Sequence, residues 1–369
     1  MSKVIYRRRK SVRPAPHPEE PTYGPLTSQE LQLAARNHSM PLEVLREDVT
    51  PPGLHYVLTH FDIPHVDTAA WHVRIGGAVE RAMELGLAAL KRDPAISVPV
   101  TLECAGNGRS LLRPRPLSQP WTLEGVGTAV WTGVPLAYLL GQAGIDPEAT
   151  EVVFTGLDEG IQGGVRHHYA RSLPIAEALR ADVVLAYKMN GADLPPQHGY
   201  PLRLVVPGWY GMASVKWLQS IQVVASPFQG FQQSVAYRYQ HTAEDAGTPV
   251  TRIRVRSLMV PPGIPDFFTR RRHLPRGPVL LRGRAWSGEG PVTGVEVGID
   301  GHWAPAQLDK PAGPFAWRGW SLPWVADPGD HELVCRARDA TGAIQPLEQH
   351  WNYQGMGNNV AQCVRVTVE

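Results

Sequence analysis

Short apolar runs alternate with short helical stretches along the first two thirds of the chain. The apolar runs predict strands at 71–75, 98–102, 152–155, 183–187, 202–206 and 221–224, and the stretches between them predict helices at 85–91, 135–142 and 174–179. A further helix is expected after Thr27-Ser28-Gln29-Glu30, which has the pattern of a capping box. This alternation indicates a mixed α+β domain.

After about residue 245 the helical pattern ends. Strands are expected at 279–281, 295–299, 333–338 and 364–368, separated by turn residues at short, even spacing. Such spacing is typical of an immunoglobulin-like β-sandwich. The charged stretch 243–249 contains Gly and Pro and is the expected boundary. The predicted organisation is therefore a flexible tail over 1–26, an α+β domain over 27–242 and a β-sandwich over 250–369.

Composition narrows the class of protein. Hydrophobic residues make up 43% of the 369 residues and charged residues 19%, which is the balance of a globular protein with a sizeable core. The 36 basic and 34 acidic residues leave a net charge of +2, which gives no reason to expect a nucleic-acid partner. No apolar run approaches the roughly 20 residues that span a bilayer, so we expect no membrane partner either.

The cysteines and the basic start of the chain bear on its compartment. Cys104, Cys335 and Cys363 are too few for a disulfide framework, although their spacing leaves a Cys335–Cys363 bridge open. The basic run 7–10 is followed by a Pro-rich stretch, and not by the apolar segment that a twin-arginine export signal requires. We therefore expect a cytoplasmic protein, or one exported together with a partner.

The first candidate for chemistry is a cysteine at the end of a predicted strand. Cys104 is followed by a Gly-Asn-Gly turn that leads to Arg109. Nearby positive charge stabilises a thiolate, which is a soft metal ligand. The residues alone leave three interpretations: a small buried apolar side chain, a nucleophile with a histidine partner, or a ligand for a metal other than zinc, since no second Cys or His stands at zinc-site spacing.

A second candidate lies in two glycine-containing loops. Residues 197–203 offer His198 and Arg203, and residues 207–217 offer Lys216. Glycine lets the backbone approach a ligand closely, and an Arg fork with a Lys point charge suits a phosphate. The alternative interpretation is a set of surface turns with solvated charges.

Together, and in this order, these motifs resemble the sulfite oxidase family of molybdenum enzymes. The resemblance covers about residues 50–369. It rests on Cys-Ala-Gly-Asn-x-Arg-Ser (104–110), Arg-Ser-Leu-Pro (171–174), Leu-Ala-Tyr-Lys-Met-Asn-Gly (185–191), His-Gly-Tyr-Pro-Leu-Arg (198–203) and Ser-Val-Lys-Trp-Leu (214–218). It implies a molybdopterin-binding α+β domain followed by an immunoglobulin-like domain that commonly dimerises, so we expect a homodimer.

The resemblance also implies roles for single residues. Cys104 would bind molybdenum through its thiolate, and Arg109 would face the substrate oxyanion. Trp121 would form an aromatic wall, and Tyr237 would be an active-site tyrosine, with Tyr239 as the alternative if the local alignment shifts. The residues that would hold the molybdopterin are Tyr56, Val57, His60, Asp158, His198, Arg203, Ser214, Val215 and Lys216. For His60 and Asp158 a purely structural role stays open.

Two positions depart from the family pattern. Leu58 and Gln354 stand where the family has arginines, so two positive charges are missing from the expected anion pocket. Each charge-assisted contact is worth roughly 1.5–3 kcal/mol, so affinity for sulfite is expected to be weaker. The candidates to compensate are Arg166, His167, His168 and Arg238, which are otherwise ordinary loop charges.

The implied activity is oxygen-atom transfer that oxidises sulfite to sulfate. The sequence has no Cys-x-x-Cys-His haem-attachment motif, so the electrons are expected to leave to an external acceptor such as a cytochrome, or to oxygen. The missing arginines leave an alternative on the same scaffold, the reduction of a neutral sulfoxide or N-oxide. A non-catalytic binding protein is a third hypothesis, against which the intact Cys104, His198, Arg203 and Lys216 argue.

Overall fold

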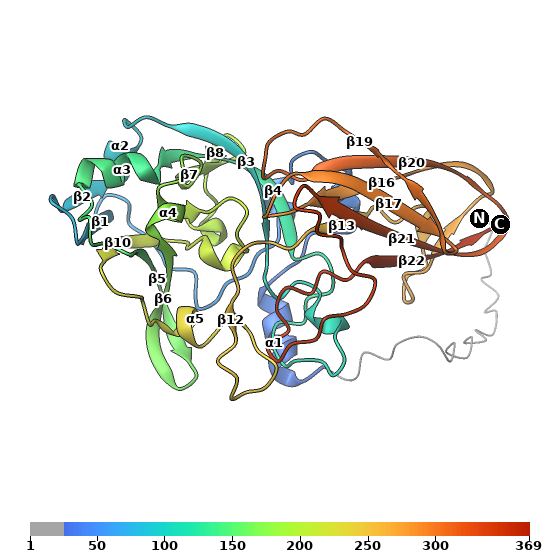
Figure 1. Ribbon diagram of the computed structural model, residues 1–369, viewed down its shortest axis with the longest axis horizontal. Helices are drawn as coiled ribbons and strands as arrows, with labels where there is room; N and C mark the ends of the chain where they lie inside the picture. Colours follow the sequence, from blue (N-terminus) through green and yellow to red (C-terminus); the bar gives the residue numbers. More distant parts are fainter. Residues whose placement is uncertain (1–25) are drawn as a thin grey trace, which may run out of the picture.

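Two lobes lie side by side in the computed structural model, which describes residues 26–369 (Figure 1). One lobe contains helices, one mixed sheet and one antiparallel sheet, and the other lobe contains only strands, which confirms the expected α+β domain followed by a β-sandwich. In each of the four larger sheets, all strands come from the same side of the predicted boundary at 243–249. The predicted tail and the basic run 7–10 lie outside the described residues, apart from Leu26.

The first lobe contains two sheets. One has the strand order β2-β1-β10-β5-β6, and the other has the order β3-β4-β7-β8 with β9 also pairing with β7. The α-helices are α1 (Ser28–Arg36), α2 (Leu87–Leu90), α3 (Leu136–Ala143), α4 (Ile175–Ala178) and α5 (Phe231–Ser234). The 3-10 helices are η1 (Leu42–Arg46), η2 (Pro52–Leu54), η3 (Arg109–Leu111), η4 (Pro196–His198) and η5 (Gly211–Ala213). The strands are β1 (His72–Gly77), β2 (Met83–Gly86), β3 (Ile96–Glu103), β4 (Val126–Pro135), β5 (Glu151–Gln162), β6 (Val165–Pro174), β7 (Val184–Met189), β8 (Ala192–Asp193), β9 (Arg203–Val205) and β10 (Leu218–Val224).

The second lobe is a sandwich of two sheets, with strand orders β13-β16-β20-β19 and β14-β15-β22-β21-β17-β18. A small hairpin of β11 (Arg238–Tyr239) and β12 (Thr248–Pro249) precedes it. Its strands are β13 (Arg256–Met259), β14 (Ile264–Pro265), β15 (Arg272–Leu274), β16 (Gly277–Trp286), β17 (Val292–Ile299), β18 (His302–Pro305), β19 (Gln307–Leu308), β20 (Arg318–Ala326), β21 (Gly329–Asp339) and β22 (Gln362–Val368). Alternate residues of β22 are buried, as expected when one face of a strand packs into a core.

The apolar runs located ten of the 22 strands in the described residues, but not their lengths, and they missed the ten-residue β4. The prediction at 152–155 covers only the buried start of the twelve-residue β5. Strand β6 was missed because its sequence begins with Arg and His side chains that stay at the surface. The predicted helix at 85–91 is wrong in its first part, since residues 83–86 pair with β1 and only Leu87–Leu90 is helical. The capping box is confirmed, because the Glu30 amide donates to the Thr27 hydroxyl and the Thr27 amide donates to the Glu30 carboxylate.

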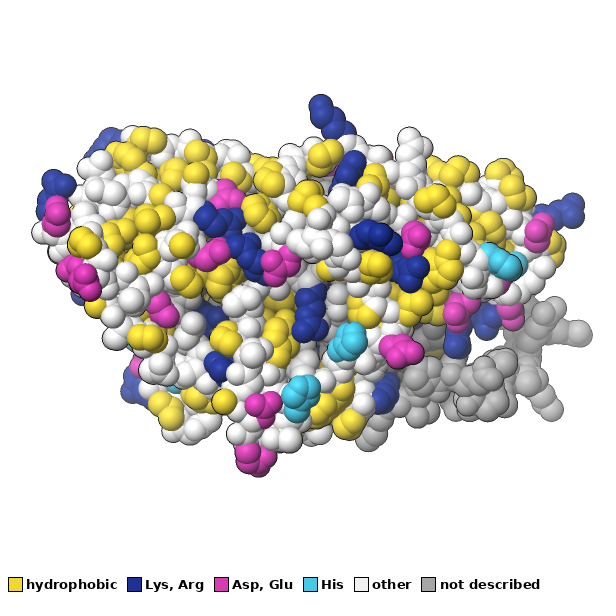
Figure 2. Space-filling model, viewed as in Figure 1, with side chains coloured by type: hydrophobic (Ala, Val, Ile, Leu, Met, Phe, Trp, Pro, Cys, Tyr) yellow, Lys and Arg dark blue, Asp and Glu magenta, His cyan; other side chains and the backbone are white. Residues whose placement is uncertain are grey.

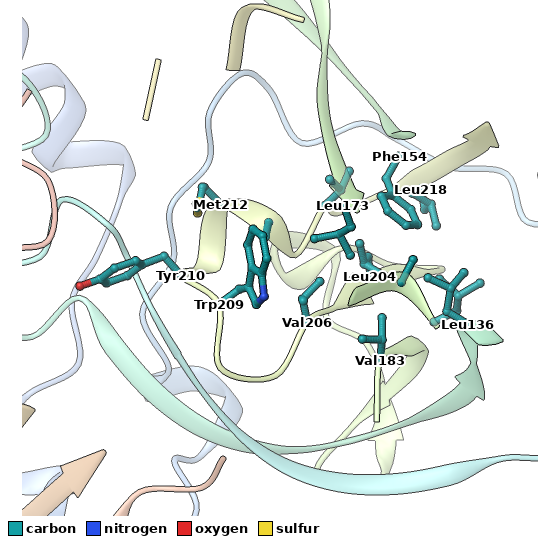
Figure 3. Close-up of a cluster of buried hydrophobic side chains, with 14 of the residues drawn as sticks. Leu136, Phe154, Leu173, Val183, Leu204, Val206, Trp209, Tyr210, Met212 and Leu218 are labelled. Atoms are coloured by element: carbon teal, nitrogen blue, oxygen red, sulfur yellow. The ribbon is translucent and has the colours of Figure 1, made fainter. Parts of the chain in front are cut away.

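One hydrophobic core joins the two lobes. In the first lobe Phe154, Leu204 and Leu218 pack between the sheet and the helices (Figure 3). The same cluster continues through Trp209 and Tyr210 to side chains of the second lobe, among them Trp286. The sandwich has a second core of its own between its two sheets. Because apolar surface is shared across the boundary, the two lobes stabilise each other.

The cysteines of the sandwich form no disulfide. Cys335 on β21 is buried in the core, whereas Cys363 on β22 is exposed, and both are free. In the ladder Cys363 pairs with Val334 and not with Cys335, so the two side chains point to opposite faces of the sheet. Within residues 26–369 no helix is long and apolar enough to cross a bilayer. Charges of both signs are interspersed on the face shown in Figure 2, and no single-sign region covers either lobe there.

A core truncation in the first lobe tests this packing. Replacing the fully buried Phe154 by alanine is expected to lower the free energy of unfolding by about 3–5 kcal/mol, because transfer and cavity costs add. The matched control is Phe268→Ala, since Phe268 is 88% exposed, and it should change stability by less than about 0.5 kcal/mol. Urea denaturation followed by tryptophan fluorescence measures both. Equal losses in the two variants would contradict the core assignment.

Candidate functional site

A cavity with an enclosed volume of about 70 Å³, opening into a wider space of about 690 Å³ that includes solvent, lies between the two sheets of the first lobe and the loops that follow their strands. Most of the residues predicted to bind a cofactor meet here. Its walls are formed by His55, Tyr56, Val57, Leu58, His60, Leu102, Cys104, Ala105, Asp158, Tyr169, Gln197, His198, Arg203, Gly211, Met212, Ser214, Lys216, Trp217 and Tyr237.

Cys104 reaches this cavity from the end of β3. Leu102 and Cys104 both line it because alternate residues of a strand share one face. The Cys104 amide donates to the carbonyl of Gly125 at 2.8 Å, which fixes the thiol at the wall. Burial raises the pKa of this thiol, and the nearby Arg109 guanidinium partly offsets that effect. The thiol therefore needs a cation or a metal in contact with it to become a thiolate.

Several cationic side chains gather around another part of the cavity. Arg203, which is 5% exposed, donates to the carbonyls of His198 and Ser214, both at 3.1 Å, and its guanidinium covers the Trp131 ring. The Lys216 ammonium donates to the carbonyls of Leu58 at 2.8 Å and Gln197 at 3.1 Å. The segments after η4 and η5 thus bring together two cationic side chains, Arg203 and Lys216, that lie 13 residues apart in the sequence (216 − 203).

Among the described residues these cations form no ion pair with a carboxylate, although Asp158 lines the same cavity and acts on Lys216. Within the part of the chain that the structure describes, neither Arg203 nor Lys216 forms an ion pair, and their hydrogen bonds go to backbone carbonyls. Burial lowers the pKa of Lys216 to about 7, with Arg203 adding to the effect and Asp158 opposing it. Burial also lowers the pKa of Arg203 to about 10. Buried cations that repel one another require an anion, and an Arg fork beside a Lys fits a phosphate.

Two histidines belong to the same cluster. His55 and His198 contact each other edge to face, with ring centroids 5.3 Å apart. Burial lowers the pKa of His55 to about 4, and burial together with His55, Arg203 and Lys216 lowers that of His198 to about 2. The His55 Nδ1 lies 3.1 Å from the Tyr56 carbonyl, and its Nε2 faces the backbone of Gly127. Because both imidazoles are neutral at pH 7, they do not compensate Arg203 and Lys216, whose buried charge fits an anionic ligand in this cavity.

Around Cys104 the cavity wall is uncharged. Tyr56, Leu102, Ala105 and Tyr237 line this part, and Tyr169 lies beside Tyr237. Burial raises the pKa of Tyr237 to about 12, so its hydroxyl keeps its proton and can donate a hydrogen bond into the cavity. Of the two tyrosines considered from the sequence, only Tyr237 lines this cavity. Tyr239 lies under the Arg254 guanidinium in a separate groove.

Arg109 and Trp121 lie behind the Cys104 loop and do not line the cavity. The Arg109 guanidinium, 5% exposed, donates to the Gln354 carbonyl at 3.0 Å and contacts the Met356 sulfur at 3.3 Å. Trp121 packs edge to face on Tyr56 with centroids 6.3 Å apart. Arg109 influences the electrostatic potential at Cys104, and Trp121 supports Tyr56 of the cavity wall. Other side chains form the surface of the cavity there.

Leu58 and Gln354, which stand where the family has arginines, lie in different surroundings. The Leu58 side chain lines the cavity. The Gln354 side chain points away from it, because its amide donates to Val235 and Gln240 and accepts from the Arg238 amide. None of the four proposed compensating residues lines the cavity. Arg166 pairs with Glu159 at the surface, His167 stacks on Phe231, His168 is exposed, and Arg238 binds the carbonyls of Ala246 and Gly247.

The structure thus gathers Cys104, Tyr56, Val57, His60, Asp158, His198, Arg203, Ser214, Lys216 and Tyr237 at one cavity. Val215 supplies backbone between two lining residues, while its side chain packs in the core. Sequence reasoning missed His55, Tyr169 and Met212. His55 directly precedes a predicted residue, and Tyr169 follows two named histidines, but only the fold shows that their side chains turn inward.

Comparison with protein families assigns each of the two lobes to a separate family. Residues 60–232 match the family described as the oxidoreductase molybdopterin binding domain, and residues 249–369 match the Mo-co oxidoreductase dimerisation domain. Sulfite oxidase of Gallus gallus is 35% identical over 342 residues, which cover 87% of this chain and 73% of that protein. Mitochondrial sulfite oxidase of Homo sapiens is 33% identical, with 96% and 68% covered.

Related proteins of other activity match as well. NADH nitrate reductase of Cichorium intybus is 33% identical over 88% of this chain and 39% of that protein. Among solved structures, the sulfane dehydrogenase SoxCD of Paracoccus pantotrophus has a TM-score of 0.78 at 24% identity, covering 99% of this chain and 97% of that one. The solved structure supports the fold, and the relatives differ in the substrates that their names state.

The histidine cluster predicts acid sensitivity of the protein without ligand. The pKa of His55 is lower in the folded than in the unfolded chain, so its contribution is fully present above pH 6.5 and is lost as the pH falls towards 4. A shift of this size corresponds to a loss on the order of 3 kcal/mol, measurable by urea denaturation between pH 7.5 and 4.5. His55→Gln should flatten this dependence, whereas replacement of the exposed His302 by Gln should not. An unchanged pH dependence in His55→Gln would contradict the prediction.

Proposed function

The chain belongs to the sulfite oxidase family of molybdopterin-dependent oxidoreductases, and we propose that it oxidises sulfite to sulfate and passes the electrons to an external acceptor. Family membership establishes a molybdenum–molybdopterin cofactor and an oxidoreductase activity. The proposal adds the substrate and the direction of the reaction. The observation that carries it is a thiol and a set of uncompensated cations on the walls of one cavity.

The residues present fit the cofactor. Arg203 and Lys216 would hold its phosphate, because they carry buried positive charge without an ion-pair partner among the described residues, and the neutral His198 beside them would add a hydrogen bond. Cys104 would bind the metal through sulfur. Among the described residues no group of three or more His, Cys, Asp or Glu could hold a metal, so the remaining ligands have to come with the cofactor. Its dithiolene sulfurs suit molybdenum as the thiolate does.

When bound, the cofactor supplies two-electron oxygen-atom transfer, and the protein supplies binding, orientation and field. Asp158, whose pKa burial raises to about 6, lines the cavity beside Lys216 and can accept hydrogen bonds from the pterin ring. The Tyr237 hydroxyl donates towards a substrate oxygen. Arg109 contributes positive potential from behind the loop, which favours an oxyanion next to Cys104.

A second candidate function is the reduction of a neutral sulfoxide or N-oxide. It is favoured by the uncharged wall around Cys104, where Leu58 lines the cavity and the Gln354 side chain is held elsewhere. A dianion that binds beside such a wall loses a large hydration free energy, and a neutral substrate loses a smaller one. Sulfite-dependent reduction of ferricyanide, compared with sulfoxide-dependent oxidation of a reduced viologen, distinguishes the two reactions in the holoenzyme.

The proposed partners follow from the same reaction. Oxidation of sulfite with water gives sulfate, two protons and two electrons, so a one-electron acceptor such as a cytochrome has to bind twice per turnover. We expect the chain to act as a homodimer through its second lobe, which matches the dimerisation domain family. Sedimentation of the purified protein tests that expectation.

Replacing Cys104 by serine tests the metal ligand. A hydroxyl is a harder donor than a thiolate, so molybdenum content and sulfite turnover should each fall by about 100-fold or more. Cys363→Ser is the control because Cys363 is the exposed cysteine, and it should retain both. Metal analysis of protein from a cofactor-competent host and the ferricyanide assay give the two readouts. Retained turnover in Cys104→Ser would overturn the ligand assignment and the proposal with it.

Restoring a charge at position 58 tests the anion site. Leu58→Arg places a guanidinium on the cavity wall, and one charge-assisted contact should lower the KM for sulfite by about tenfold. Leu58→Met keeps the wall neutral and should leave KM nearly unchanged. Sulfoxide-dependent turnover should not improve in Leu58→Arg. An unchanged KM for sulfite in a variant with normal molybdenum content would show that an anion does not bind beside residue 58.

A further inference from the structure

The side chain next to Cys104 points away from the cavity and into the second lobe. Glu103 is the last residue of β3 and is 1% exposed. Because successive side chains of a strand point to opposite faces, Cys104 turns to the cavity and Glu103 turns to the sandwich. A carboxylate this deeply buried needs partners for both oxygens, and the mechanism described above does not use it.

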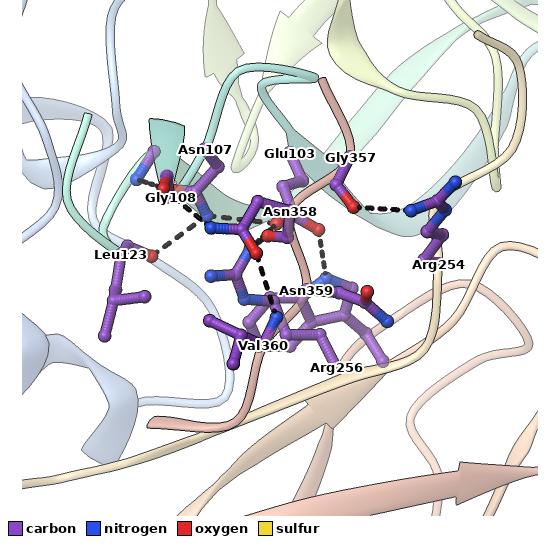
Figure 4. A network of polar contacts seen from close by, with 12 residues as sticks. Glu103, Asn107, Gly108, Leu123, Arg254, Arg256, Gly357, Asn358, Asn359 and Val360 are labelled. Atoms are coloured by element: carbon purple, nitrogen blue, oxygen red, sulfur yellow. Dashed lines mark hydrogen bonds and ion pairs between the residues drawn. The ribbon is translucent and has the colours of Figure 1, made fainter. Parts of the chain in front are cut away.

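The second lobe provides those partners from two adjacent strands (Figure 4). Arg256 of β13 donates to Glu103 Oε1 at 2.7 Å, and the indole of Trp286 in β16 donates to Oε2 at 2.8 Å. Arg256 and Trp286 are directly opposite each other in the ladder, so one register position of the sandwich presents both donors. Asn107, in the loop after Cys104, adds a donor to Oε1 at 3.0 Å.

A second part of the sandwich lobe, residues 354–358, contacts the loop that carries Cys104. The Gly357 amide donates to the carbonyl of Ala105 at 2.6 Å, and the Asn358 amide group donates to that of Gly108 at 2.8 Å. Arg256 also donates to the Asn358 carbonyl at 2.9 Å, which ties this segment to the ion pair (Figure 4). A Cβ at Gly357 would lie 2.5 Å from the Tyr239 hydroxyl, and its φ of +60° favours glycine.

The loop that carries Cys104 is therefore held by its own sheet on one side and by the second lobe on the other. We propose that Glu103 and Arg256 are a positioning pair through which the second lobe sets the geometry of the Cys104 thiol for metal binding. Buried hydrogen bonds of this kind keep a ligand-bearing loop in one conformation, as partners of metal ligands do elsewhere. The inference rests on Cys104 being the metal ligand, as proposed above.

The structure offers a matched control for a merely structural role. Glu177 in the first lobe also accepts from an arginine of the second lobe, Arg252, and from an indole, that of Trp209. This pair joins the same two lobes, but neither Glu177 nor Arg252 lines the cavity. Removing Arg256 leaves the buried Glu103 carboxylate without a charge partner, whereas Glu177 keeps its ion pair with Arg180 when Arg252 is removed. Both changes weaken the contact between the lobes, and Arg256→Met costs more stability. Only Arg256→Met should also disturb Cys104.

The first experiment uses the full-length protein without cofactor, in a Cys363→Ser background so that the exposed thiol is absent. Arg256→Met is expected to raise the rate of alkylation of Cys104 by iodoacetamide by about tenfold, because the loop opens locally more often. Arg252→Met should change that rate less than about twofold. Mass spectrometry of the peptide that contains Cys104 separates it from the buried Cys335. Equal rates in the two variants, or no increase in Arg256→Met, would overturn the proposal.

The second experiment measures metal loading of protein made in a cofactor-competent host. Molybdenum content should fall by about tenfold or more in Arg256→Met and stay near wild type in Arg252→Met. If Arg256→Met does not fold, Glu103→Gln and Arg256→Lys replace it, since both keep the shape and at least one hydrogen bond. Arg256→Lys should then rescue loading relative to Glu103→Gln, and a failure to do so would count against the pair. The alkylation result stands even if Cys104 proves not to bind the metal, so the two proposals fail separately.

Discussion

The fold depends at one point on a buried ion pair at the end of a strand. Strand β3 ends in Glu103, whose carboxylate is fixed by Arg256 and Trp286 of the sandwich, and the next residue is Cys104 at the cavity wall. A charge pair that is 1% exposed on both sides is costly to desolvate and costly to break. It therefore fixes the register between the two lobes at the residue beside the candidate metal ligand.

The cavity combines two environments that are usually kept apart. Around Arg203 and Lys216 it holds buried positive charge whose hydrogen bonds go to backbone carbonyls, with Asp158 as the one acidic side chain among its described lining residues. Around Cys104 it is lined by tyrosines and aliphatic side chains. Tyr56 lies between the two parts, since both Cys104 and Arg203 influence the pKa of its hydroxyl. The largest effect on that pKa is burial, which raises it. An anionic group on one part and a sulfur-bound metal on the other would satisfy both environments at once.

The same arrangement explains why the substrate is harder to assign than the cofactor. The cofactor is shown by the family to which the chain belongs, and many of the side chains proposed to hold it line one cavity. The substrate would meet only a few side chains, and two of the expected arginines are replaced by Leu58 and Gln354. Relatives named sulfite oxidase and nitrate reductase share the scaffold, so the scaffold alone does not select the substrate.

The sequence by itself determined the α+β domain, the following sandwich, the cofactor family and most of the cavity, because local periodicity and spaced motifs are properties of short segments. It located the buried part of β5 but not its full length, and it missed β6, whose first residues stay at the surface. Only the tertiary structure decided that Tyr237 and not Tyr239 faces the cavity, that Arg109 and Trp121 lie behind the loop, and that His55 and Tyr169 belong to the wall. These facts depend on which way a side chain turns and on contacts between residues more than 100 positions apart, such as that of Glu103 with Arg256. No short stretch of sequence carries that information.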